Sequence, residues 1–224
     1  MTLRQNEDPS LLVVHEDERL IAVSKPAGQL VIPGRGETDV RPLCQQVEAR
    51  AGQRVFVVHR LDRDASGLVV FAKDAATHRS LSLSFEKRDV RKTYWVVVKG
   101  QMTEGGRIDK PLHAFGSGRM GIDSRGKPSL TEYRIKRNFL NSTWLEVEPH
   151  TGRRHQIRVH FYSLGHPVLG DVYYGLERPV EGVSRLMLHA RGLVLPMEGS
   201  SPLEISTEPP EDFMQIIEKL NGGR

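Results

Sequence analysis

The segment His59–Gly67 holds the side chains best suited to chemistry, with two aspartates, Asp62 and Asp64, among a histidine and two arginines. It lies between two apolar runs, residues 55–58 and 68–72, whose composition is typical of strands. A carboxylate held at the rim of a sheet can act as a nucleophile or as a general base. In most loops of this kind, however, an aspartate caps backbone groups and the arginines are solvated. The residue types alone leave both interpretations open.

Several ordered segments point to one family. His59-Arg60-Leu61-Asp62, followed by Ser66-Gly67-Leu68, resembles the signature of RluA-like RNA pseudouridine synthases, although Ala65 stands where threonine or serine is commoner. Further segments are similar in order and spacing, and the resemblance runs from about residue 11 to about residue 208: Leu20–Gly28, Arg91–Tyr94, Thr151–His160, Gly165–Asp171 and Arg185–Ala190. Because the first motif begins by residue 11, we expect a stand-alone catalytic domain without an N-terminal RNA-binding domain.

The resemblance implies an isomerase that converts uridine in structured ribosomal or transfer RNA to pseudouridine. Substrate and product are isomers, so no cofactor and no metal is expected. Asp62 is the implied catalytic residue, and attack on the sugar, addition to uracil and abstraction of a sugar proton all remain open roles for it. By resemblance, Arg158 pairs with Asp62 and keeps it ionised. Tyr94 would stack on the uracil ring and help to remove a proton from its carbon.

The resemblance also implies a set of substrate-binding residues. Arg60 is the candidate wedge that fills the space left when the target base flips out of its stack. Leu188 and Leu186 would close the other side of the uracil, although either could be plain core. His59, Arg154 and Lys25 complete the set. Seven basic residues are candidates for phosphate contacts, although a single basic residue is more often a solvated surface charge: Lys25, Arg35, Arg63, Arg91, Lys92, Arg153 and Arg154.

Two other classes of function are compatible with parts of the pattern. A non-catalytic RNA-binding or ribosome-assembly protein would need no paired carboxylate, and the joint presence of Asp62, Tyr94 and Arg158 argues against it. A carboxylate-dependent hydrolase of nucleosides would also attack the sugar's anomeric carbon. Release of free uracil would distinguish hydrolysis from isomerisation.

Two further patterns suggest other sites but lack the context that those sites need. The segment Gly116–Gly121 matches the dinucleotide-binding glycine pattern, yet no apolar strand leads into it and no helix follows, so we expect a hairpin tip. His150, His155, His160 and His166 could suggest zinc, but a spacing of five residues turns two helical rings apart. Packing and RNA contacts are the better explanation for these histidines.

Composition sets broad limits on the protein's class. The chain has 224 residues, a net charge of +4 and a single cysteine, Cys44, which excludes an internal disulfide. The positive charge suits a polyanionic partner such as RNA. No apolar stretch approaches the roughly 20 residues of a membrane span, and residues 1–10 are polar, unlike a secretory signal. We therefore expect a cytoplasmic protein, with a monomer as the default.

Strands occur in runs rather than in alternation with helices, which favours an α+β fold with a mixed, mostly antiparallel sheet flanked by helices. We expect a polar tail over residues 1–10 and a single catalytic domain over 11–224. Thr38 or Asp39 is the expected cap of the first helix. Helices are predicted over 40–52, 74–87, 154–164 and 210–220, and strands over 11–15, 20–24, 55–58, 68–72, 93–99, 131–136, 143–148, 191–195 and 203–207.

Overall fold

A computed structural model describes residues 11–34, 41–175 and 180–222. The chain divides into two compact units. The first unit comprises residues up to Arg91 together with Ala190–Glu208, and the second comprises Lys92–His189 with the residues from Pro209 onward. The tail over residues 1–10, Arg35, and the expected caps Thr38 and Asp39 lie outside the described residues.

The first unit is a sheet with one helix on each face. Its strands are ordered β1-β2-β4-β11, with β3 beside β4 and β12 beside β11, and the pairs β1–β2, β2–β4, β3–β4 and β11–β12 are antiparallel. The strands predicted over 11–15 and 20–24 are confirmed, and they form an antiparallel hairpin. Its elements are β1 (Leu12–Glu16), β2 (Leu20–Lys25), α1 (Leu43–Ala51), β3 (Phe56–Val57), β4 (Ser66–Ala72), α2 (Ala75–Lys87), most of β11 (Leu188–Leu195) and β12 (Leu203–Ser206).

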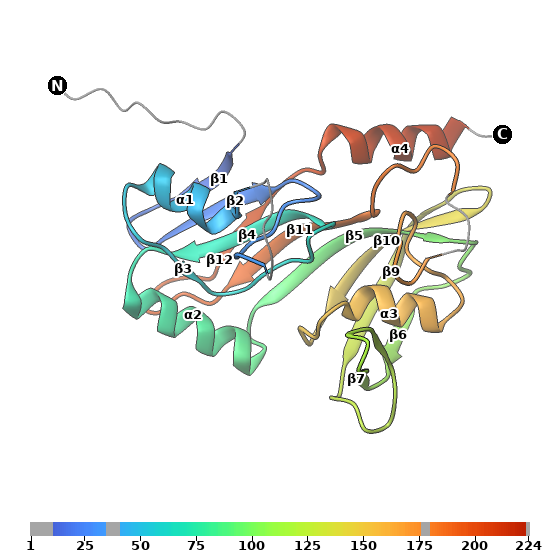
Figure 1. Cartoon of the computed structure of the whole chain (residues 1–224), viewed down its shortest axis with the longest axis horizontal. Helices are drawn as coiled ribbons and strands as arrows, with labels where there is room; N and C mark the ends of the chain where they lie inside the picture. The colour runs from blue at the N-terminus through green and yellow to red at the C-terminus, as the bar shows by residue number, and fades with distance from the viewer. Residues whose placement is uncertain (1–10, 35–40, 176–179, 223–224) are drawn as a thin grey trace. The chain divides into compact units, whose positions relative to one another are not determined.

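Alternation along β2 explains why this sheet is covered on both sides. Leu20 packs in one hydrophobic cluster with Leu81 of α2, whereas the next residue, Ile21, packs in another with Leu43 and Val47 of α1. Successive side chains of a strand point to opposite faces, so both faces of β2 are apolar and both must be buried. Figure 1 accordingly shows α1 and α2 on opposite sides of β2 and β4.

The ends of the two helices follow local rules. Helix α1 begins at Leu43 with Pro42 at the N-cap position, so it starts later than the predicted residue 40. The residue before a proline is disfavoured in helical conformation, which explains why the helix does not extend back through Arg41. It ends as predicted at Gly52, which adopts the left-handed conformation. Helix α2 is capped by Asp74, whose side chain accepts the backbone N–H of Thr77 at 2.8 Å.

The second unit has a four-stranded antiparallel sheet, ordered β5-β10-β9-β6, and a separate hairpin of β7 and β8. The hairpin tip was predicted at Gly116–Gly121 and is confirmed. Figure 1 shows α3 and α4 on opposite sides of β5 and β10. Its elements are β5 (Arg91–Lys99), β6 (Gly106–Asp109), β7 (Leu112–Ala114), β8 (Met120–Ile122), β9 (Leu130–Asn138), β10 (Ser142–Pro149), α3 (Gln156–Ser163) and α4 (Glu211–Gly222).

The predicted α+β class is confirmed, and the differences are local. Strands β6, β7 and β8 were not predicted because they are only three or four residues long, and β6 and β8 also contain glycine. Helix α3 starts two residues later than predicted, since His155 has a φ of 55° and belongs to the left-handed region.

Gly67 marks a close approach between backbone segments of the first unit. A Cβ atom at this position would lie 2.3 Å from the carbonyl oxygen of Ala190 and 2.5 Å from its nitrogen, and the φ of Gly67 is 119°. Gly28 also has a positive φ, 83°, but a Cβ there would have no atom within 4 Å. A side chain at Gly67 would therefore meet both backbone strain and a steric clash, whereas one at Gly28 would meet backbone strain alone.

We expect Gly67→Ala to lower the free energy of unfolding by more than about 3 kcal/mol, because strain and overpacking add. Gly28→Ala should cost only about 1–2 kcal/mol, the usual penalty for a left-handed residue with a side chain. Urea unfolding of both variants beside the wild type measures the difference. Equal losses would show that the approach to Ala190 does not constrain β4.

Candidate active site

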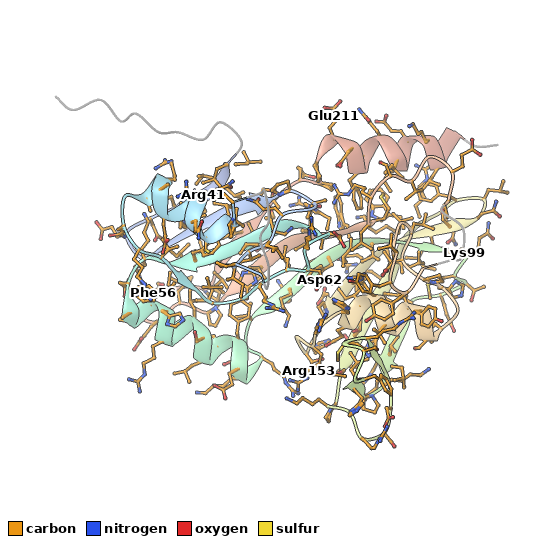
Figure 2. All side chains as sticks on the ribbon, viewed as in Figure 1. Arg41, Phe56, Asp62, Lys99, Arg153 and Glu211 are labelled. Carbon is orange, nitrogen blue, oxygen red and sulfur yellow. The ribbon has the colours of Figure 1, made fainter. Side chains whose placement is uncertain are left out.

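Asp62 lies in the loop between β3 and β4 of the first unit and is partly buried (Figure 2). The residue after it is tied to the turn that follows β2. The carbonyl oxygen of Arg63 accepts the backbone N–H of Gly28 at 2.9 Å, and the Arg63 Nε donates to the carbonyl oxygen of Gly28 at 3.0 Å. This reciprocal pair fixes the backbone next to the candidate carboxylate.

Lys25 provides a third link to the same loop. Its side chain is only 1% exposed, and its ammonium donates to the carbonyl oxygens of Pro26, Gln29 and Arg63 at 2.8, 2.9 and 2.9 Å. A buried ammonium requires such acceptors. The contact with an RNA phosphate predicted for Lys25 is therefore not supported, because its charge faces backbone carbonyls away from solvent. Lys25 instead holds the Asp62 loop in place.

His59 and Arg60 begin this loop in different environments. The His59 ring stacks on Phe85 with centroids 4.8 Å apart, and its Nε2 accepts the backbone N–H of Val70 at 3.0 Å. These contacts show His59 as a packing residue, and its predicted contact with substrate stays a prediction. Arg60 is exposed, so its side chain can reach a ligand.

Tyr94 and Arg158 belong to the second unit. Tyr94 is a partly buried residue of β5 and pairs with Val147 of β10. Arg158 lies on α3 and is 2% exposed. Because Asp62 belongs to the first unit, the predicted ion pair between Asp62 and Arg158 stays a prediction.

Arg158 forms a two-pronged ion pair with Asp171. Its Nε lies 2.7 Å from Asp171 Oδ2 and its Nη2 lies 2.8 Å from Oδ1. The Asp171 Oδ1 also accepts the backbone N–H groups of Tyr173 and Tyr174 at 2.8 and 3.0 Å. The guanidinium carbon lies 5.5 and 5.3 Å from the ring centroids of Tyr173 and Tyr174. A buried guanidinium with these partners has one orientation.

The charge on Asp171 follows from these contacts. Burial raises its pKa, but the hydrogen bonds and charge of Arg158 and the backbone N–H groups of Tyr174 and Tyr173 outweigh burial and lower the pKa below its usual value. Asp171 is thus held ionised. Sequence reasoning included Asp171 in a matching segment but gave it no role, because nothing in the spacing of residues 158 and 171 indicates contact.

The remaining predicted substrate-binding residues occupy contrasting positions. Leu186 and Leu188 are buried, at 3% and 4% exposure, as expected of core residues. Arg154 is exposed just before α3. Arg153 is partly buried, and its Nε has no hydrogen-bond partner among the described residues.

The histidines considered for zinc are engaged within the protein. His160 places its ring nitrogens 2.9 Å from Thr131 Oγ1 and 3.1 Å from the carbonyl oxygen of Lys110, and burial lowers its pKa. His155 Nδ1 lies 2.8 Å from the Tyr174 hydroxyl. Within the described part of the chain, no three His, Cys, Asp or Glu side chains are grouped to hold a metal ion. The helices described there are also too short or too polar to cross a membrane.

Comparisons with known proteins decide the family. The model of the family described as RNA pseudouridylate synthase matches residues 19–163. Relatives named ribosomal large subunit pseudouridine synthase D, from Haemophilus ducreyi and Escherichia coli K12, are both 37% identical to this chain. The alignments cover 94% and 96% of this chain and 70% and 72% of the relatives. The chain belongs to the RNA pseudouridylate synthase family.

Solved structures agree with this assignment for the pseudouridine synthase. Human RNA Pseudouridylate Synthase Domain Containing 1 matches with a TM-score of 0.78 and 26% identity, over 98% of each chain. Human RNA Pseudouridylate Synthase Domain Containing 4 matches with a TM-score of 0.76 and 26% identity, over 93% of this chain and 92% of that one. The enzyme is thus an isomerase that converts uridine in RNA to pseudouridine.

The Arg158–Asp171 pair can be tested in the synthase through its effect on stability. Asp171→Asn keeps the shape of the side chain but removes the carboxylate that binds two nitrogens of the buried guanidinium, so we expect a loss of about 3–5 kcal/mol in the free energy of unfolding at pH 7. Asp123→Asn is a matched control, because Asp123 pairs with Arg125 at the surface, and it should change stability little. Urea unfolding measures both.

The stability difference between the wild type and Asp171→Asn should depend on pH. A carboxyl group whose pKa is lowered in the folded state stabilises the protein above its unfolded-state pKa, about 3.9 for aspartate, and that contribution is lost as the pH falls toward the lowered value. The advantage of wild type over Asp171→Asn should therefore be constant near neutral pH and shrink below about pH 4. An advantage that persists unchanged at lower pH would contradict an ionised Asp171.

Proposed function

We propose that this pseudouridine synthase modifies uridine in large-subunit ribosomal RNA and that Asp62 is its catalytic residue. The relatives that cover most of the chain are named for the ribosomal large subunit, which favours this target over transfer RNA. The observation that carries the assignment of Asp62 is its loop, in which a partly buried carboxylate follows Arg60 and precedes a backbone held by Gly28 and Lys25. A fixed carboxylate is what each of the three possible roles requires.

The reaction moves one bond and one proton. The bond between the sugar's anomeric carbon and the uracil nitrogen breaks, and the same sugar carbon then bonds to a ring carbon of uracil. That ring carbon loses its proton, and the released nitrogen gains one, so atoms balance without a co-reactant. In the proposal Asp62 acts ionised, Arg158 favours that ionised form, and Tyr94 stacks on the uracil and helps to take the ring proton.

Arg60, Leu186 and Leu188 have proposed roles around the base. The exposed guanidinium of Arg60 fills the gap left by the flipped uridine, while the two leucines lie against the uracil. Binding energy then comes from phosphate contacts with exposed or partly buried cations of both units, namely Arg63, Arg91, Lys92, Arg153 and Arg154.

We further propose a monomeric, cytoplasmic enzyme in which residues 11–224 act as a single catalytic domain. Ribosomal RNA as substrate favours that compartment. The proposed catalytic residues are divided between the two units, so neither unit carries the full set.

The first test is mapping of pseudouridine in ribosomal and transfer RNA from cells that lack the protein. We expect one or more sites in large-subunit RNA to vanish and to return with the wild type but not with Asp62→Ala. Asp64→Ala is the matched control, because it removes the same charge from the same loop, and it should restore the sites. Restoration by Asp62→Ala would exclude a catalytic role, and free uracil released by purified enzyme would indicate hydrolysis instead.

A second test concerns Arg60. We expect Arg60→Ala to lower kcat/KM about tenfold or more on a folded stem-loop and much less on an unstructured oligonucleotide, because only the folded RNA must give up stacking when the base flips. Arg79→Ala removes another exposed arginine, on α2, and should affect neither substrate. If Arg60→Ala impairs both RNAs equally, Arg60 is a general contact and not a wedge.

A further inference from the structure

A tight turn after α3 presents one aromatic ring to solvent. The turn runs from Gly170 to Gly175, and both glycines lie where a side chain has no room. A Cβ at Gly170 would lie 1.8 Å from the carbonyl oxygen of Arg185, and one at Gly175 would lie 1.7 Å from that of Asp171. Asp171 also binds two backbone N–H groups inside the turn. The backbone that carries residues 171–174 is therefore strongly constrained.

The two tyrosines of the turn have opposite exposures. Tyr174 is 1% exposed, and its hydroxyl accepts the backbone N–H of Met120 at 3.0 Å and contacts His155 Nδ1 at 2.8 Å. Tyr173 is 56% exposed, although its backbone N–H is bound by Asp171. Tyr174 thus fastens the turn to the neighbouring elements, and Tyr173 is the ring that the turn displays.

The Tyr173 ring contacts two side chains, one of which is Arg158 of the candidate site. The guanidinium carbon of Arg158 lies 5.5 Å from its ring centroid, and the His155 ring lies 5.9 Å away. These contacts restrict the ring without covering it. An aromatic ring that is ordered before a ligand arrives loses little conformational entropy when the ligand stacks on it.

We propose that Tyr173 is a stacking platform for an unpaired nucleobase beside the target uridine. RNA is the substrate of the family, and bases that are not paired are recognised by stacking on aromatic side chains. Exposed cations lie on the neighbouring segments, since Arg119 contacts the Tyr174 ring at 5.2 Å and Arg154 precedes α3. They suit the phosphates on either side of a stacked base.

The proposal extends the proposed function, because it rests on Arg158 lying in the catalytic site and on a target uridine that leaves its stack. A nucleotide that stacks on Tyr173 would then be a close neighbour of that uridine along the RNA. Tyr173 would thus favour RNA in which the nucleotide next to the target uridine is unpaired. It would not contribute to recognition of the target uridine itself. It touches substrate but not the reacting atoms.

Tyr162 offers a matched control for the experiment. It is a second tyrosine of the same unit, it is 48% exposed, and its ring also neighbours Tyr174, with centroids 6.2 Å apart. Among the described residues, no cation lies over its ring. A general loss of aromatic surface would affect Tyr162→Ala and Tyr173→Ala alike.

The experiment measures binding separately from catalysis. Each variant is made in full-length protein that also carries Asp62→Ala, and its affinity is measured for a stem-loop transcript containing the mapped uridine, with 2-aminopurine in place of each flanking nucleotide in turn. We expect Tyr173→Ala to weaken binding about tenfold and to abolish quenching of one flanking 2-aminopurine. Tyr173→Phe should retain both affinity and quenching, and Tyr162→Ala should change neither.

A further comparison tests the base itself. When the quenched nucleotide is replaced by an abasic one, Tyr173→Ala should no longer weaken binding, because the partner of the ring is gone. Equal losses for Tyr173→Ala and Tyr162→Ala, a loss for Tyr173→Phe, or an unchanged effect on abasic RNA would each overturn the platform. Activity restored by Asp62→Ala would refute the proposed catalytic residue alone, since the binding results do not depend on turnover.

Discussion

The ion pair between Arg158 and Asp171 is the interaction on which the second unit's part of the site depends. A guanidinium that is 2% exposed needs a fixed counter-charge, and Asp171 supplies it through both oxygens while the same carboxylate binds the backbone of the following turn. Helix α3 and residues 171–174 are thereby locked together. Two of the five N–H donors of Arg158 are used in this pair, and the edge formed by Nε and Nη2 belongs to Asp171.

The first unit holds its catalytic candidate by a different means. The ammonium of Lys25 donates to three backbone carbonyls, and Gly28 exchanges two hydrogen bonds with Arg63. Hydrogen bonds to backbone groups fix the path of the loop that carries Asp62. The close approach of Gly67 to Ala190 holds the other end of the loop. Rigid ends with a partly buried centre suit a residue that must meet a substrate.

The features that could be predicted from the sequence are those that a short stretch of residues determines. The short apolar run over residues 20–24 predicted a strand, Gly52 predicted a helix end, and the order of the motifs predicted the family, because each of these signals can be read along the sequence. The partners of Arg158 and Lys25 could not be predicted, because residues from other parts of the chain supply them. Arg158 and Asp171 meet through folding across thirteen residues, and Lys25 turns inward because carbonyls from two loops surround it. The start of α1 is instead determined locally, because Pro42 disfavours the helical conformation at Arg41.

The fate of the basic residues shows why net charge alone is a weak guide to RNA binding. Several cations already have partners within the protein: Lys25 has carbonyls, Arg158 has Asp171, Arg185 has Asp212 at 2.6 Å, and Lys73 has Glu16 at 2.7 Å. These side chains count toward the formal charge of +4 although they are engaged in contacts of the protein's own. An RNA phosphate binds most favourably to a basic side chain that is exposed to solvent. Arg60 and Arg63 in the Asp62 loop and Arg154 before α3 are exposed, so the cations proposed to bind RNA lie on the same segments as the proposed catalytic residues.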